Sequence, residues 1–214
     1  MIKAILFDID GVIIRHQNYF WETLPTDKYY NPIVTISRLY KTDDNRKCDK
    51  GELDILDYIK PFLELINWDK LAEDYLNLQY KYEYQFIDFE LLSKINTIKC
   101  IGIKTFIASN QIQYRKKHLI KMMDVDNVFS DYYFSCDIGY VKSENEYWDK
   151  VLTNIKERHA NIRNEEMLFI DDMDKNTIKA KEFGLQTCLI SCKKDIEDII
   201  RKIEEGSGLT IAST

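Results

Sequence analysis

Two aspartates separated by one residue, Asp8 and Asp10, follow a short apolar run near the start of the sequence, MIKAILFDIDGV. Such a pair can divide covalent chemistry between a nucleophile and a group that transfers protons. Gly11 comes next, and glycine lets the chain leave the end of a strand sharply, so that both carboxylates can address one reacting atom. The opening residues therefore indicate nucleophilic and acid–base chemistry at the end of a strand.

Polar residues also follow three later apolar runs. Ser109 and Asn110 come directly after IKTFIA, Lys142 lies just past YYFS, and Asp171 and Asp172 come after MLFI. Ser109, Lys142 and Asp171 follow one another at intervals of about 30 residues, the length of one βα unit. Because the carboxyl ends of parallel strands meet at one edge of a sheet, we expect all of these side chains to converge there.

The expected site contains four carboxylates, those of Asp8, Asp10, Asp171 and Asp172. Their mutual repulsion is unfavourable unless a cation neutralises them. The ligands are hard oxygens without a thiol or an imidazole among them, which favours Mg²⁺. A lysine and a serine hydroxyl at the same edge suit a phosphate better than a carbonyl. Together these groups predict phosphoryl transfer.

The elements that position these residues follow a regular alternation. Short apolar runs of strand type lie at 3–7, 103–108, 132–135, 167–170 and 186–190. From about residue 100 onward a helix-type segment follows each run, which predicts an α/β fold with a doubly wound, Rossmann-like parallel sheet. Ser143 and Glu146 have the spacing of a capping box and predict a helix start, and Gly184 predicts the end of the next helix.

A long insertion interrupts the alternation between the first two strands. About 100 residues separate them, where a single βα unit takes about 30, so roughly 70 are inserted. We expect residues 15–85 to form a helical cap, 1–14 and 86–205 to form the catalytic core, and 206–214 to form a flexible tail. Since the insertion leaves the sheet at its ligand-binding edge, it is a candidate lid.

Composition favours a soluble globular protein: of 214 residues, 45% are hydrophobic and 31% charged. The net charge of -6 and the lack of a continuous basic stripe argue against nucleic acid as a partner. The sequence has neither a membrane-length apolar run nor a secretory pattern, so we expect a cytoplasmic protein without a membrane partner. The 5 cysteines form no Cys-x-x-Cys pair and predict small core residues.

The segments FDIDGV, ASN, Lys142 and IDDMDKN resemble the four ordered motifs of the haloacid dehalogenase-like (HAD) superfamily, and the resemblance extends from residue 3 to about 200. The position of the insertion is similar to that of the helical C1 caps of this superfamily. Asn176 stands where the last motif often ends in aspartate, a departure that bears on metal affinity but removes no catalytic group.

The resemblance implies a role for each motif residue. Asp8 would be the nucleophile that forms an aspartyl-phosphate, and Asp10 the general acid and base. The substrate's phosphate would be bound by Ser109, Asn110 and Lys142. Mg²⁺ would be held by Asp8, Asp10, Asp171 and Asp172.

Asp10 also bears on the reaction class. A halide leaves without a proton, whereas an alkoxide leaving group needs one, so an acid two residues after the nucleophile favours cleavage of a phosphate ester. We therefore predict a Mg²⁺-dependent phosphatase that hydrolyses a small phosphorylated metabolite through phospho-Asp8. A phosphomutase would use the same groups. A non-catalytic binding protein on the same scaffold is disfavoured, because no charged motif residue is lost.

The insertion is rich in aromatic residues, which either line a substrate pocket or simply pack a small helical domain. These residues are Tyr19, Phe20, Trp21, Tyr29, Tyr30, Tyr80, Tyr82 and Tyr84. Arg15 and His16, close to the first motif, are further candidates for substrate contact. The sequence does not identify the substrate.

Overall fold

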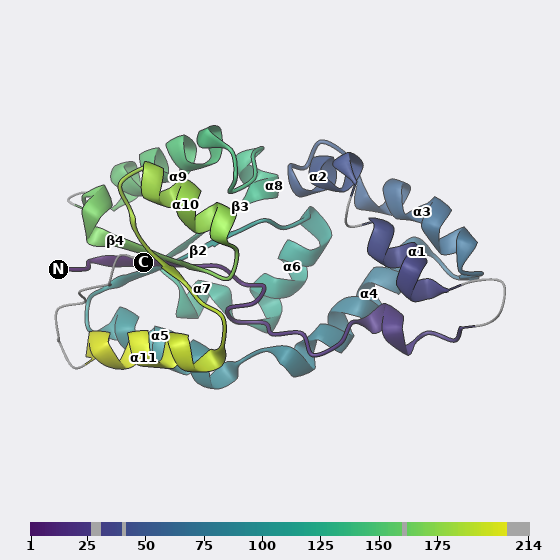
Figure 1. The fold of residues 1–214 in the computed structure, drawn as a ribbon, viewed down its shortest axis with the longest axis horizontal. Helices are drawn as coiled ribbons and strands as arrows, with labels where there is room; N and C mark the ends of the chain where they lie inside the picture. The colour runs from purple at the N-terminus through teal and green to yellow at the C-terminus, as the bar shows by residue number, and fades with distance from the viewer. Residues whose placement is uncertain (27–30, 40–41, 160–161, 205–214) are drawn as a thin grey trace.

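The computed structural model describes residues 1–26, 31–39, 42–159 and 162–204. Two parts lie end to end along the molecule: a layered α/β core and a group of helices that contains α1 to α4 (Figure 1). Tyr29 and Tyr30 of the insertion and the expected tail at 206–214 lie outside the described residues.

A parallel five-stranded sheet with the order β3-β2-β1-β4-β5 forms the centre of the core. Its strands are β1 (Ala4–Phe7), β2 (Lys104–Ser109), β3 (Asp131–Phe134), β4 (Met167–Asp171) and β5 (Gln186–Leu189). They match the five expected strands to within one residue at each end, so the predicted doubly wound α/β fold is confirmed. The strand order reverses between β1 and β4, and the residues after these two strands therefore lie side by side.

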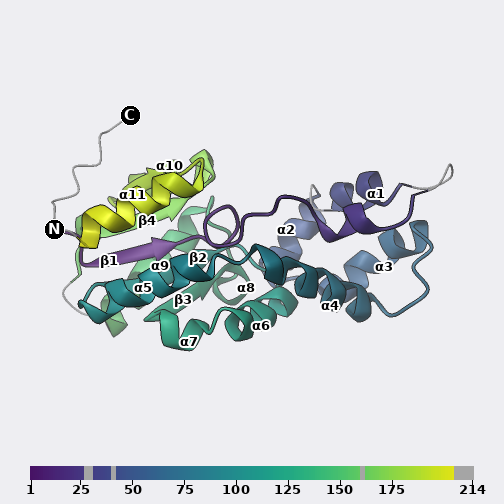
Figure 2. The ribbon, with the colours of Figure 1, turned by 90° about the horizontal axis from the view of Figure 1, so that it is seen from below.

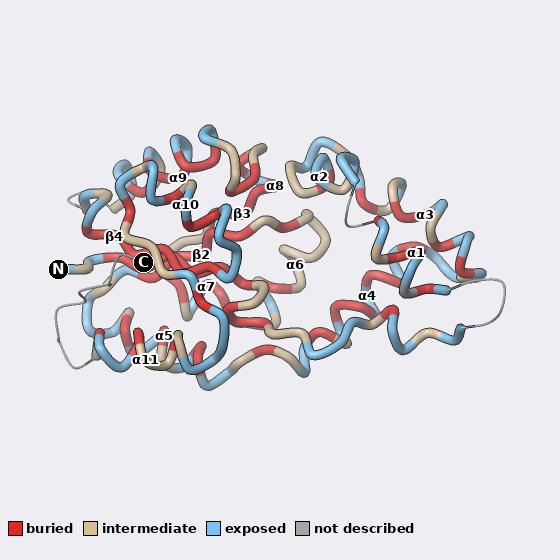
Figure 3. Tube along the Cα trace, viewed as in Figure 1, coloured by how far each residue is buried: buried red, intermediate tan, exposed pale blue. Residues whose placement is uncertain are grey.

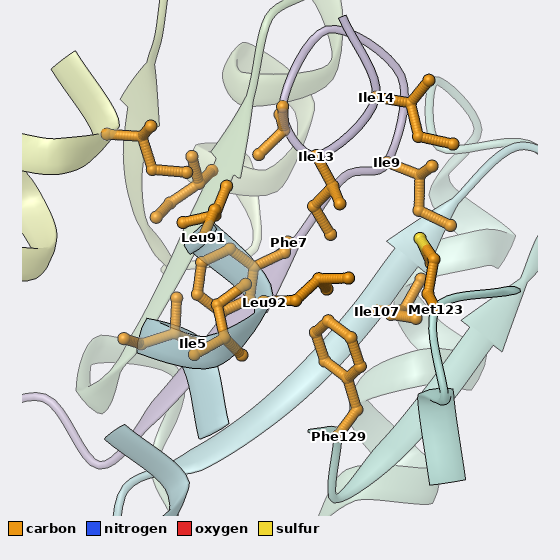
Figure 4. Close-up of a cluster of buried hydrophobic side chains, with 14 of the residues drawn as sticks. Ile5, Phe7, Ile9, Ile13, Ile14, Leu91, Leu92, Ile107, Met123 and Phe129 are labelled. Atoms are coloured by element: carbon orange, nitrogen blue, oxygen red, sulfur yellow. The ribbon is translucent and has the colours of Figure 1, made fainter. Parts of the chain in front are cut away.

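Alternate residues of each central strand face opposite helical layers, as strand geometry requires. Ile5 and Phe7 pack with residues of α5, α6, α7 and α11, whereas Ala4 and Leu6 pack with residues of α9 and α10. Figure 4 shows the first of these layers, with Leu91 inserted beside Phe7, and Figure 2 shows α5 and α11 lying along one face of the sheet. The tube in Figure 3 is buried along the central strands β1 and β4 and exposed on the outer helical turns. Burial of each such Ile, Leu or Phe contributes about 1.5–3 kcal/mol to folding.

Helices cover both faces of the sheet and make up the second part of the molecule. The α-helices of the described residues are α1 (Pro32–Leu39), α2 (Asp43–Asp49), α3 (Ile55–Leu65), α4 (Ala72–Glu83), α5 (Phe89–Cys100), α6 (Gln113–Met122), α7 (Val125–Val128), α8 (Ser135–Ile138), α9 (Asn145–Arg158), α10 (Asp174–Glu182) and α11 (Lys193–Glu204). Short 3₁₀ turns lie at Phe20–Thr23 (η1), Tyr84–Phe86 and Asn164–Glu166. None of the helices described here is long and apolar enough to cross a membrane.

Of the two expected helix boundaries, one is confirmed and the other is wrong. Gly184 follows α10 with a left-handed φ of +81°, as predicted. The capping box of Ser143 and Glu146 is wrong, because α9 begins at Asn145 with Glu144 as its N-cap. The Glu144 carboxylate accepts the N–H of Val141 at 3.0 Å, and it also pairs with two cations of α2 and the turn after it. These tertiary contacts set the start of the helix.

The helical part has a hydrophobic cluster of its own. Buried side chains from η1 and α1 to α4, among them Trp21, Ile36, Ile59 and Tyr75, contact one another rather than the sheet. Such a cluster is what the insertion needs in order to fold as a unit over the core. The boundaries 15–85 stay a prediction.

Candidate active site

Asp8 lies directly after β1, beside the end of β4. Its backbone N–H donates to the carbonyl oxygen of Ile170 at 2.9 Å, which extends the pairing of the two strands by one residue. The Nζ atom of Lys142 lies 2.6 Å from Asp8 Oδ2 and 2.6 Å from Asp171 Oδ2. All three side chains are almost fully buried. A buried lysine between two carboxylates compensates charges that would otherwise be costly to remove from water.

Burial and neighbouring charges together raise the pKa of both Asp8 and Lys142. Burial raises the pKa of Asp8 to about 7; Lys142 opposes this shift and the Asp171 carboxylate adds to it. Burial alone would lower the pKa of Lys142, but Asp8 and Asp171 raise it above its ordinary value. Lys142 therefore stays charged, and a cation beside Asp8 would favour the ionised carboxylate further.

Three carboxylates form a site that fits a divalent cation. One oxygen each from Asp8, Asp171 and Asp172 lies within 4.8 Å of the others. Burial, and next the charge of Asp171, raise the pKa of Asp172, as crowding of like charges requires. Hard oxygen ligands at this spacing suit Mg²⁺. Among the described residues the carboxylate of Asp10 is not part of this cluster, and the predicted contact of Asp10 with the metal stays a prediction.

Asn176 orients one of these carboxylates. Its Nδ2 atom lies 3.1 Å from both oxygens of Asp171, and the N–H of Met173 donates to Asp171 Oδ1 at 2.7 Å. Together with Lys142 these donors fix the plane of the Asp171 carboxylate. The departure from the family's last motif thus places an amide donor where it holds a candidate metal ligand.

Gly11 packs against the third carboxylate. It has a φ of +75°, and a Cβ atom at this position would lie 2.1 Å from Asp172 Oδ2. Glycine is required here for two reasons: it adopts the left-handed backbone conformation easily, and it has no Cβ atom that would clash with Asp172. The sharp turn after Asp10 therefore brings the first loop against the loop after β4.

We expect Gly11→Ala to weaken Mg²⁺ binding about tenfold or more, because the added methyl group displaces Asp172. Titration calorimetry with Mg²⁺ measures this change. Gly139→Ala is the matched control: Gly139 has a φ of +82°, and a Cβ atom added there would meet nothing within 4 Å, so this variant carries the backbone cost without the clash. Equal Mg²⁺ affinity of the two variants would contradict the argument.

The carboxylate of Asp10 turns toward the helical part of the molecule. It accepts hydrogen bonds from Arg115 Nη1 and Nη2, both at 2.6 Å. The same guanidinium donates from Nε to Glu83 at 2.8 Å, and His16 Nε2 lies 3.7 Å from Asp10. Burial alone would raise the pKa of Asp10, but Arg115 holds it well below its usual range. Arg115, on α6, thus ties Asp10 to the end of α4.

Ser109 and Asn110 connect the end of β2 to these groups. The Oγ atom of Ser109 accepts a hydrogen bond from Gln111 Nε2 at 3.0 Å, and the same amide nitrogen lies 2.8 Å from Asp10 Oδ2. Asn110 Oδ1 accepts the backbone N–H of Lys142 at 2.9 Å. The predicted residues are therefore gathered at one edge of the sheet.

A cavity of about 450 Å³ opens beside Asp10, between the core and the helical part. Of the aromatic residues and their neighbours singled out in the sequence, His16, Tyr19, Trp21 and Tyr80 line it. The others have structural contacts: Phe20 and Tyr82 contact each other, Tyr84 contacts Phe89, and Arg15 donates to the carbonyl oxygen of Gly11. Trp21 and Tyr80 also belong to the hydrophobic cluster of the helical part, so the same residues can both pack the insertion and line the cavity.

Sequence reasoning missed Arg115, Glu83, Gln111 and Asp49, which also border Asp10 or the cavity. The separation of Gln111 and Arg115 by four residues near the start of a helix was a weak signal. Glu83 and Asp49 lie in the insertion, and no motif marks them.

A doubly wound sheet with a carboxylate cluster and a buried lysine at its switch point defines an α/β enzyme whose reacting groups lie at the strand ends. The chain belongs to the haloacid dehalogenase-like hydrolases: the model of that family matches residues 2–184. The resemblance inferred from the motifs is thereby confirmed. A search of curated protein sequences gave no significant match.

Solved structures with this fold come from several bacteria. The HAD family enzyme BT-2542 of Bacteroides thetaiotaomicron, in complex with magnesium and inorganic phosphate, has a TM-score of 0.64 at 18% identity, over 93% of this chain and 99% of that one. YfnB of Bacillus subtilis, bound to magnesium, has a TM-score of 0.61 at 16% identity, over 94% and 99%. L-2-haloacid dehalogenase of Xanthobacter autotrophicus has a TM-score of 0.61 at 14% identity, over 98% and 85%. At these identities the likeness concerns the fold.

Proposed function

We propose that this hydrolase is a Mg²⁺-dependent phosphatase that cleaves a small phosphomonoester through a phospho-Asp8 intermediate. The carrying observation is the buried Asp8 carboxylate, held at 2.6 Å by Lys142 and within 4.8 Å of two further carboxylates. Complexes of BT-2542 with magnesium and inorganic phosphate support the choice of cation and substrate class. Residues 15–85 are proposed to be the cap over this site.

The proposed reaction has two steps. An oxygen of Asp8 attacks phosphorus, the bond from phosphorus to the ester oxygen breaks, and the leaving alkoxide takes up a proton. Water then attacks the phosphorus of phospho-Asp8, giving inorganic phosphate and regenerating the carboxylate. Lys142 and the hydroxyl of Ser109 bind the phosphoryl oxygens, and Asp8, Asp171 and Asp172 would hold Mg²⁺, which supplies charge neutralisation at phosphorus.

Asp10 is proposed as the proton-transfer group. Paired with Arg115 it is ionised, which suits the removal of a proton from the attacking water. To donate a proton to the leaving group it must part from Arg115, whose Nε atom is bound to Glu83 of α4. A shift of the helical part relative to the core would alter this pairing, and the YfnB crystal form reveals interdomain movement in that protein.

Dehalogenation is the competing activity within the family. Halide leaves without a proton, so the first step of that reaction needs no general acid at the position of Asp10, beside the nucleophile and facing the cavity. Asp10 therefore favours an ester substrate.

The test is phosphate release from a panel of metabolite phosphates and p-nitrophenyl phosphate, with Mg²⁺ and with excess chelator. We expect release that depends on Mg²⁺, and no halide release from L-2-chloropropionate under the same conditions. An isomerised phosphate ester without free phosphate would establish a mutase. Halide release without phosphate release would establish a dehalogenase; either result overturns the proposal.

A further inference from the structure

The wall that the helical part contributes to the cavity is acidic. Asp49 ends α2 and Glu83 ends α4, and both border the cavity together with the amides of Asn45 and Gln79. The described lining residues include no lysine; their one arginine, Arg115, is already bonded to Asp10 and Glu83, and their one histidine, His16, lies 3.7 Å from Asp10. This composition disfavours a substrate with a second anionic group, because the anion would meet carboxylates without a cation to receive it.

Asp49 is the carboxylate with the least compensation. Its Oδ2 atom lies 3.5 Å from Asn45 Nδ2, and the described part of the chain gives it no ion pair. Its backbone oxygen accepts a hydrogen bond from Ser135 Oγ at 2.6 Å, which anchors the end of α2 to the core. Burial, and next the charge of Asp10, raise the pKa of Asp49 to about 7. A partly buried carboxylate in this state is stabilised by a ligand that brings a positive charge.

The helical part also contributes aromatic residues to the cavity lining. The rings of Tyr19 and Trp21 stack with their centroids 4.3 Å apart, and both border the cavity. Aromatic faces attract an ammonium group and also pack against the carbon skeleton of the molecule that carries it.

We propose that the cavity selects phosphomonoesters whose alcohol carries a cationic amine, and that Asp49 is the residue that binds the amine. The assignment rests on the proposed phosphatase function. The phosphate would lie at Asp8 and Lys142, and the amine would extend past Asp10 toward the end of α2. Asp49 is thus a specificity-determining residue of the site.

The test compares three six-carbon phosphate esters that differ in charge beyond the phosphate: glucosamine 6-phosphate, glucose 6-phosphate and 6-phosphogluconate. We expect kcat/KM to fall in that order, by at least about tenfold between the first and the last. Equal values, or a preference for 6-phosphogluconate, would overturn the proposal. It would also be overturned if the amine ester were neither hydrolysed nor inhibitory while p-nitrophenyl phosphate was hydrolysed. Failure to hydrolyse p-nitrophenyl phosphate would instead overturn the phosphatase function, and this assignment with it.

Asp49→Asn tests the residue itself. We expect the variant to lose most of the preference for glucosamine 6-phosphate over 6-phosphogluconate, through a higher KM for the amine ester and a lower KM for the acid. Asp43→Asn is the matched control, because it removes the same charge from an exposed position on the same helix. Loss of kcat/KM by the same factor for all three esters would reveal a merely structural role and contradict the assignment. Retention of the full preference would contradict it as well.

Discussion

Asp8→Asn is expected to abolish phosphate release, lowering kcat by at least about a thousandfold, while the protein stays folded. An amide cannot serve as the nucleophile, so phospho-Asp8 would not form. The substitution is nearly isosteric. A neutral amide takes the place of a buried carboxylate, whose pKa is raised by burial. Lys142 keeps its second partner, Asp171, at 2.6 Å. Steady-state release of phosphate and urea denaturation of the variant measure the two halves of this prediction.

Mass spectrometry of the wild-type enzyme, quenched during turnover, tests directly whether the phospho-Asp8 intermediate forms. A phosphoryl group is expected on the peptide that contains Asp8 and is expected to be absent from the variant. Asp57→Asn, at an exposed position of α3, controls for the loss of one aspartate. Undiminished phosphate release by Asp8→Asn would show that another group attacks phosphorus.

Lys142→Met is expected to lower the free energy of unfolding by about 3–5 kcal/mol, because it leaves the buried carboxylates of Asp8 and Asp171 without their shared cation. Phosphate release would fall as well, since the lysine neutralises the phosphoryl oxygens in the proposed reaction. Urea denaturation in the absence of Mg²⁺ measures the loss of stability. Lys60→Met, at an exposed position, is expected to leave stability unchanged.

The double variant Asp8→Asn, Lys142→Met identifies the cause of the loss. If the loss arises from unpaired carboxylates, removal of one of them recovers part of the stability, and the two substitutions are not additive. A double variant that is no more stable than Lys142→Met would point instead to the lost contact of the lysine with Phe169, whose ring centroid lies 5.7 Å from Nζ.

The positions of the charged motif residues were predictable because a parallel sheet leaves little freedom. Once β1 and β4 are neighbours, the register that pairs Phe7 with Ile170 places Asp8 beside Asp171. The lysine between them follows from the length of the intervening βα unit. The sequence was therefore sufficient for the strands, the strand-end site and most of its carboxylates.

The direction of the Asp10 side chain was not predictable in this way. It depends on Arg115 and Glu83, which are close in space but belong to different helices. The start of α9 was mispredicted for a similar reason, because Glu144 is engaged by cations near α2 that no local pattern reveals. Local rules failed where the helical insertion contacts the core.

The guanidinium shared by Asp10 and Glu83 has a consequence for any redesign of substrate range. A helical insertion taken from another hydrolase and grafted onto this core would bring its own residue to the place of Glu83. If that residue were not an acid, Asp10 would be the only carboxylate bound to Arg115 among the partners described here, and it would be held more firmly. Positions 83 and 115 must therefore be exchanged together, and a cap library built on this scaffold should couple them.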